Sequence, residues 1–439
     1  MVGILDWGIW ITYFVLMFLL LMVYRNTKKE SYYRFFLAGF VLKIMGGLGF
    51  AMIYVYYYGF GDTFAYFNGS GVLADALVDD PGSYFRLIFS SADSFSGDLR
   101  QYTSQIVYST GHEEWFMIKL LSPFTFLSFK SYIVITLFTS LFSFVGAWKL
   151  FLVFRRILPN KDFLSFVAAF LIPSTLFWGG GIMKDTLTLG CINLLIYYTY
   201  ELLFENRWVF KYIFGSIMCI VLIYMLKAYI LLCFVPALLF GINALMKVKF
   251  DNPIIRRLMN IIVIGVSVVL VFAVSNFVGE NSQKYSVGGL ESRVKGFHTW
   301  HTFQGGSAYD LGVTDYSPVG VLTKIPASLN VTFFRPYLWE ARNPVILIAA
   351  VESLVFFILL MAAIFSRKLK IFSSFASHPM IVIFGIYCLI FGFVVGFTSY
   401  NFGALARYKI PIFSLFAFLI IYINIYRKEK TKPKKIEVI

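Results

Sequence analysis

The sequence carries eleven separate apolar runs that are each close to the length of a membrane span. A helix needs about 20 apolar residues to cross the hydrocarbon core of a bilayer. Only 14% of the residues are charged and 59% are hydrophobic, so the chain has too little polar surface for a soluble enzyme of this length. We expect an all-α polytopic membrane protein, folded as a single integral membrane domain, 1–439. The runs are 7–24, 36–58, 131–153, 163–179, 186–204, 210–226, 228–246, 258–277, 344–364, 379–397 and 409–426.

One pair of runs leaves two interpretations open. Only Lys227, Ala228 and Tyr229 mark the turn between the runs 210–226 and 228–246. Two spans and a single re-entrant hairpin would both produce this pattern, and the count of eleven assumes two spans.

The distribution of charge predicts the orientation in the membrane. Basic residues directly follow the first run, and Lys and Arg accumulate in cytoplasmic segments. With eleven spans, the segments on that side, counted with Glu201, hold 22 basic and 7 acidic residues, which accounts for the net charge of +15. We therefore expect the N-terminus outside, the C-terminus inside, and a cytoplasmic basic tail, 427–439, close to anionic membrane lipids. A nucleic-acid partner is not needed to explain the charge.

In this topology the two longest connections between spans, 59–130 and 278–343, lie on the extracytoplasmic side. The first mixes aromatic and acidic stretches, which is typical of short helices that lie at the membrane interface. The second is rich in Gly and Ser. Because the long loops lie on this face, we expect function there.

Two acids stand where apolar runs meet the outer face. Asp62 follows the second run, and Asp185 opens the fifth after three glycines. A carboxylate at that depth is partly desolvated and is a better base, although both acids could instead cap helices. Lys184 could neutralise an anionic group or simply snorkel to the interface. Tyr66, one helical turn after Asp62, is a candidate to bind substrate, as are Glu340, Arg342 and Tyr408 before later runs.

Basic residues precede the ninth and the last runs. Arg335, Glu340 and Arg342 lie before the ninth run, and Arg407 and Tyr408 lie before the last. Arginine suits phosphate because it forms paired hydrogen bonds. The alternatives are an interfacial belt of aromatic and basic residues or an ion pair with an acid of the outer loops.

Weaker signals complete the set. His298 and His301 have a spacing that could hold a metal on a helix, but glycines nearby argue against a helix. A divalent metal is possible without any supporting ligand motif, and the cofactor is unknown. Glu352 lies inside a run, where we expect a hydrogen bond to a neighbouring helix. Lys43 is expected to snorkel, and Lys409, like Arg407, stands on the side where basic residues are disfavoured.

The layout resembles the GT-C superfamily of membrane glycosyltransferases. The stretch from Pro173 to Trp178, followed by Lys184 to Leu187, is similar to the proline-to-acid segment that leads into a span in that superfamily. By this resemblance Asp62 matches the first-loop acid, Asp185 the second-loop acid, and Arg407 the late basic residue near the donor phosphate.

The resemblance implies an inverting transfer of a sugar from a polyprenyl phosphate to a hydroxyl of a glycan, lipid or protein. Asp62 would be the catalytic base, Asp185 would orient the acceptor, and Lys184, Arg335 and Arg407 would bind the donor phosphate. The site would face outward from a bacterial cytoplasmic membrane. In two respects the chain departs from the superfamily: two runs precede Asp62 rather than one, and no second acid stands beside it.

Two other functions stay open. A polysaccharide polymerase or ligase that uses pyrophosphate-linked glycans would rely on Arg335, Arg342 and Arg407, with His298 or His301. A non-catalytic subunit of an envelope complex, or a flippase, would need none of the outer acids and would have stable protein partners.

Overall fold

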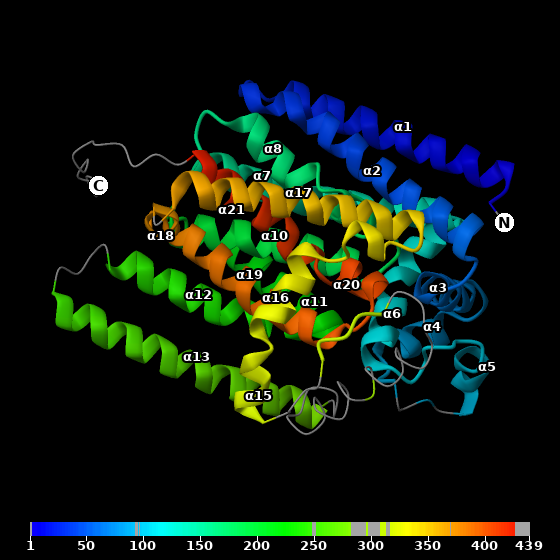
Figure 1. Ribbon diagram of the computed structural model, residues 1–439. Coiled ribbons are helices and arrows are strands. Elements are labelled where there is room, and N and C mark those ends of the chain that lie inside the picture. The colour runs from blue at the N-terminus through cyan, green and yellow to red at the C-terminus, as the bar shows by residue number, and fades with distance from the viewer. Residues whose placement is uncertain are drawn as a thin grey trace.

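The protein is almost entirely helical, as a computed structural model shows (Figure 1). The part of the chain that it describes contains no β-strand, which confirms the all-α expectation. His298, His301 and the tail 427–439 lie outside the described residues. The described residues are 2–92, 95, 97–247, 252–281, 296, 308–312, 317–368 and 370–425.

Among these residues, seven helices are long and apolar enough to cross a membrane. An eighth candidate is the pair α20 (Phe402–Tyr408) and α21 (Ile410–Ile425), which bends by 69°. The stretch 210–246 forms two separate helices, each long and apolar enough to cross a membrane. The seven are α1 (Ile4–Asn26), α2 (Phe36–Ile53) with its flanking turns η1 (Ser31–Phe35) and η2 (Tyr54–Tyr58), α7 (Tyr132–Ile157), α11 (Phe210–Lys227), α12 (Tyr229–Lys247), α17 (Pro344–Arg367) and α19 (Pro379–Thr398).

The other predicted spans take different forms. The run 163–179 is broken into α8 (Asp162–Phe170) and α9 (Pro173–Phe177), because proline lacks the N–H that a continuous helix requires. The run 186–204 forms α10 (Lys184–Leu203), and 258–277 lies within α13 (Pro253–Asn281). The structure thus shows several possible spans, and the count of eleven stays a prediction.

The long helices run side by side (Figure 1). α7 and α10 pack against each other near the centre, and both are buried along most of their length. α2 packs on α7, and α12 packs on α19. α1 begins at the right of Figure 1 and α21 ends at the left, so the described chain starts and finishes at opposite ends of the bundle.

Helices α3, α4, α5 and α6 lie together at the right-hand end of Figure 1. The predicted helices of segment 59–130 are present, and α3 packs against α4 and α6. Segment 278–343 contributes α16, which packs on α19 and α17. Their position at a membrane interface stays a prediction. The helices of the two segments are α3 (Asp62–Asp79), α4 (Pro81–Phe89), α5 (Arg100–Thr103), α6 (His112–Leu127), α15 (Pro318–Thr323), α16 (Ile325–Phe334) and the short turns η3 (Gly97–Leu99) and η5 (Leu338–Glu340).

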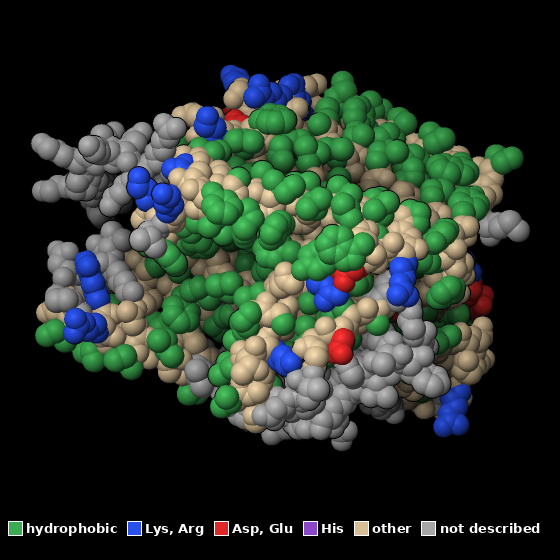
Figure 2. Space-filling view, in the orientation of Figure 1, with side chains coloured by type: hydrophobic (Ala, Val, Ile, Leu, Met, Phe, Trp, Pro, Cys, Tyr) green, Lys and Arg blue, Asp and Glu red, His purple; other side chains and the backbone are tan. Residues whose placement is uncertain are grey.

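The visible surface is divided by residue type (Figure 2). Lys and Arg side chains gather at the left and upper-left end of this face, and hydrophobic side chains cover much of the area between the two ends. The right-hand end carries both acidic and basic side chains. A broad apolar band between polar ends is what a bilayer-spanning bundle requires.

Candidate functional site

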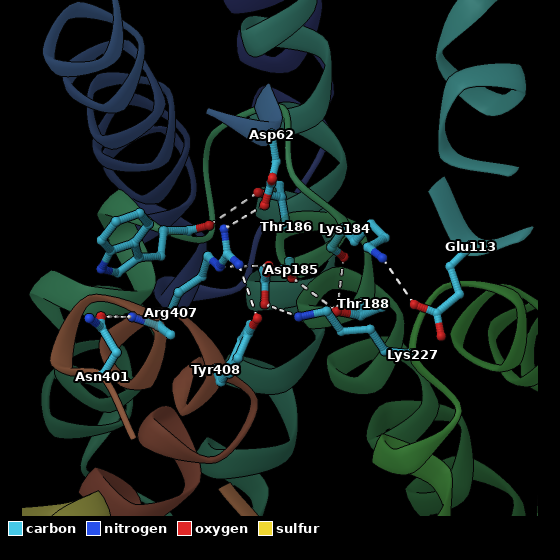
Figure 3. Close-up of polar contacts among 12 residues, drawn as sticks. Asp62, Glu113, Lys184, Asp185, Thr186, Thr188, Lys227, Asn401, Arg407 and Tyr408 are labelled. Carbon is cyan, nitrogen blue, oxygen red and sulfur yellow. Dashed lines mark hydrogen bonds and ion pairs between the residues drawn. The ribbon is translucent and has the colours of Figure 1, made fainter. Parts of the chain in front are cut away.

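Four of the predicted residues, Asp62, Asp185, Arg407 and Tyr408, meet in one cluster at the end of the bundle where α3 and α20 lie (Figure 3). The Arg407 guanidinium lies between two carboxylates. Its Nη1 is 3.1 Å from Asp62 Oδ2 and its Nε is 3.6 Å from Asp185 Oδ2. Residues far apart in the sequence are thus brought into direct contact.

Two glycines place Asp62 at this point. Gly59 (φ 70°) follows η2, and Gly61 (φ 130°) precedes α3. Glycine adopts such positive φ angles without strain. Asp62 is the first residue of α3 and Asp185 lies in the first turn of α10, yet neither carboxylate caps its helix. The capping alternative is therefore wrong for both acids, and both are free to bind Arg407.

A second cation, Lys227, completes the buried side of the cluster. It ends α11, and its Nζ lies 2.5 Å from Asp185 Oδ1 and 4.4 Å from the centre of the Tyr408 ring. Tyr408 also accepts a hydrogen bond of 3.1 Å from Arg407. From its sequence position, Lys227 is expected only in the turn between two apolar runs. It had the same signal as Arg407, a basic residue at the outer end of a predicted span.

Tyr108 is a further residue that sequence reasoning missed. Its hydroxyl donates to Asp62 Oδ1 at 2.9 Å. Burial raises the pKa of Asp62, but the charge of Arg407 and the hydrogen bond from Tyr108 outweigh it and hold that pKa below 3.8. Burial and the neighbouring carboxylate raise the pKa of Tyr108 to about 12. At neutral pH Asp62 is therefore ionised and Tyr108 is protonated. The expectation that desolvation makes Asp62 a stronger base is wrong, because Arg407 and Tyr108 lower its pKa.

Lys184 is held by two acids from another segment. Its Nζ lies 3.0 Å from Glu113 and 2.7 Å from Glu114, both in the first turn of α6. The contact ties α6 to the start of α10. An anionic ligand that approached Lys184 would have to compete with both carboxylates.

Exposure falls steeply across the cluster. The Asp62 side chain is 36% exposed, Arg407 is 18% exposed, and Asp185 is only 4% exposed. A substrate can therefore reach the cluster from the side of Asp62. Predicted Tyr66 is buried beside this edge, with its ring 5.7 Å from that of Tyr108.

Arg335 and Glu340 form a cluster of their own. The Arg335 Nε donates to the Glu340 carboxylate at 3.1 Å, and the guanidinium lies 5.1 Å from the ring of Phe402 in α20. No ion pair within the described part of the chain joins Arg335 to Asp62 or Asp185. Arg342 is exposed. The structure therefore brings neither arginine into the Arg407 cluster.

In the described ranges, no group of three or more His, Cys, Asp or Glu side chains could hold a metal ion.

Comparisons with protein-family models, curated proteins and solved structures find no match to this chain.

Proposed function

We propose that the protein is a membrane glycosyltransferase that moves a sugar from a polyprenyl-phosphate donor to a hydroxyl acceptor. One observation carries the proposal: Arg407 lies between Asp62 and Asp185, 3.1 Å from the accessible acid. An ionised carboxylate beside an arginine offers a base for a hydroxyl and a cation for a phosphate within reach of one bound substrate.

The reaction follows from these two groups. Asp62 removes the proton of the acceptor hydroxyl while that oxygen attacks the anomeric carbon from the face opposite the phosphate. The bond between the anomeric carbon and the phosphate oxygen breaks, and its electron pair stays on the phosphate. Arg407 stabilises the charge that grows there. The products are an inverted glycoside and a polyprenyl phosphate.

Asp185 has a different role from the one its resemblance implies. Because its side chain is 4% exposed and is bound by Lys227 and Arg407, it orients these cations rather than the acceptor. Asp62 and Asp185 also balance the charges of Arg407 and Lys227. A site without excess positive charge fits a donor with one phosphate better than a pyrophosphate donor.

The same proposal includes the topology. We place eleven spans in a bacterial cytoplasmic membrane, with the N-terminus outside, the C-terminus inside, and the cluster on the extracytoplasmic side. Two features support this orientation: the cluster lies at the end of the bundle with α3 and α20, and basic side chains gather at the opposite end (Figures 1 and 2).

The test is a donor comparison. Purified protein in vesicles receives labelled sugars on polyprenyl monophosphate or on polyprenyl pyrophosphate, together with a mixture of hydroxyl acceptors from cell envelopes. We expect sugar transfer and release of polyprenyl phosphate from the monophosphate donor. Turnover of the pyrophosphate donor alone would instead identify a polymerase or ligase and overturn the proposal.

A further inference from the structure

The break between α8 and α9 is buried and meets two ionisable side chains. Glu352 Oε2 accepts the Ser174 N–H at 2.7 Å, and Lys43 Nζ donates to the Thr175 carbonyl at 2.5 Å. Lys43 is 2% exposed and Glu352 is 5% exposed. Because a broken helix leaves backbone groups without partners in apolar surroundings, these two side chains satisfy groups that would otherwise be costly to bury.

Lys43 and Glu352 reach α9 from different helices. Lys43 lies in α2 and Glu352 in α17, and both helices contact α9. The carboxylate binds an N–H at the start of α9 and the ammonium binds a carbonyl, which is the arrangement that aligned peptide dipoles favour. Apolar contacts would join the three helices without burying charge. Lys43 and Glu352, unlike apolar side chains, each bind one particular backbone atom of α9.

The chain from α9 to Asp185 is held along its whole length. The Gly180 carbonyl accepts a hydrogen bond from Ser140 at 2.7 Å, and the Trp178 carbonyl accepts one from Thr186 at 3.2 Å. A Cβ added at Gly179 would lie only 2.4 Å from the Thr175 carbonyl oxygen. The connection between α9 and Asp185 is therefore tightly packed and hydrogen-bonded to its neighbours.

The same turn of α17 also contacts the segment that carries Arg407. Lys409 is fully buried, and its Nζ donates to the Arg335 carbonyl at 3.2 Å and to Ser353 Oγ at 3.4 Å. Ser353 adjoins Glu352, and Lys409 lies two residues after Arg407. Helix α17 therefore contacts α9, which precedes α10 in the chain, and α20, which carries Arg407.

We infer that Glu352 and Lys43 are positioning residues that fix the broken α8–α9 segment and, through it, the approach of Asp185 to Arg407. Since Asp185 helps to hold Arg407 beside Asp62, the pair controls the geometry of the exposed acid without touching substrate. The catalytic consequence rests on the proposed function, whereas the positional one does not.

The first test compares Glu352→Gln with Glu201→Gln as a matched control. Glu201 is also buried in a long helix, is bound by Arg156 at 2.8 Å, and lies 16 residues along α10 from Asp185, about 24 Å away. For Glu352→Gln we expect kcat to fall by up to about 10²-fold with little change in KM. We also expect the acid limb of the pH profile to move to higher pH as Arg407 withdraws from Asp62. The control should lose thermal stability only.

Conservative replacement sharpens this test. Lys43→Arg keeps a donor for the Thr175 carbonyl and should retain more of kcat than Lys43→Met. Equal loss in the two Lys43 variants, or an unchanged acid limb in Glu352→Gln, would overturn the inference.

The second test does not depend on catalysis. The shifts in unfolding temperature of Glu352→Gln and Asp185→Asn should not add in the double variant, whereas those of Glu201→Gln and Asp185→Asn should add, as for independent sites. Additive shifts for the first pair would overturn the inference even if the protein transfers sugar. Coupling in a protein that transfers no sugar would instead reject only the proposed function. If Glu352→Gln does not fold, Lys43→Met takes its place in the cycle.

Discussion

Asp62 and Asp185 carry the same carboxyl group, but their surroundings give them different roles. Asp185 is buried and bound by two cations, whereas Asp62 is partly exposed and bound by Arg407 and Tyr108. Only Asp62 can therefore exchange a proton with a substrate that arrives from outside the cluster.

Replacing Tyr108 should change the pH at which Asp62 gains its proton. The pKa of Asp62 is depressed, so its ionised form, and the stability that it contributes, persist at neutral pH and are lost as the pH falls through the folded-state pKa. Tyr108→Phe removes one group that lowers this pKa, and activity should fall at a higher pH than in the wild type. Tyr84→Phe, which breaks a hydrogen bond between Tyr84 of α4 and Ser122 of α6, should leave the acid limb unchanged. A pH–rate profile of the three proteins decides this.

Removing Lys227 should strongly destabilise the protein. Lys227→Met leaves the buried Asp185 with a single cation at 3.6 Å, and breaking a buried ion pair costs about 3–5 kcal/mol. Denaturant unfolding in detergent measures this loss. The double variant Lys227→Met/Asp185→Asn should recover part of it, because no uncompensated charge remains. A single variant as stable as the wild type would contradict the structure of the cluster.

At the scale of the element, close backbone contact between α2 and the α9–α10 connection should limit substitution. A Cβ at Gly180 would lie 2.6 Å from the backbone of Gly47, whereas one at Gly49 would meet nothing within 4 Å. Gly180→Ala should therefore lower stability by about 1–3 kcal/mol, and Gly49→Ala should be neutral or stabilising by up to about 1 kcal/mol. Equal unfolding temperatures for the two variants would show that this contact is not tight.

The elements also show what sequence patterns can predict. Asp62, Asp185 and Arg407 were recognisable because each interrupts apolar sequence at the end of a predicted span. Lys184 was recognisable in the same way, but its partners in α6 were not, because pairing between distant segments leaves no local pattern.

Of the two ionisable residues inside predicted spans, one expectation is confirmed and the other is wrong. Glu352 was expected to bond a neighbouring helix, and its contact with Ser174 confirms this. Lys43 was expected to snorkel, and this is wrong, since it is buried against Thr175. The error follows from the α8–α9 break, which a continuous apolar run did not reveal and which supplies the carbonyl that Lys43 binds.

For the whole molecule, the prediction is the orientation in the membrane. Thr27 and Thr110 are both exposed and lie on opposite sides of the bilayer in the proposed topology, and the four native cysteines are buried. A membrane-impermeant maleimide should label Thr110→Cys in intact cells and Thr27→Cys only after the membrane is permeabilised. The reverse labelling pattern would contradict the proposed orientation and place the cluster on the cytoplasmic side.

The central claim is that Asp62 is the base of a sugar-transfer reaction, and one comparison tests it most directly. Asp62→Asn keeps the shape of the side chain, while Asp75→Asn alters another acid of α3, paired with Lys130 away from the cluster. With a polyprenyl-phosphate sugar in vesicles, we expect kcat to fall by about 10²–10⁴-fold in Asp62→Asn and to stay near the wild-type value in Asp75→Asn. Near wild-type transfer by Asp62→Asn would contradict the claim.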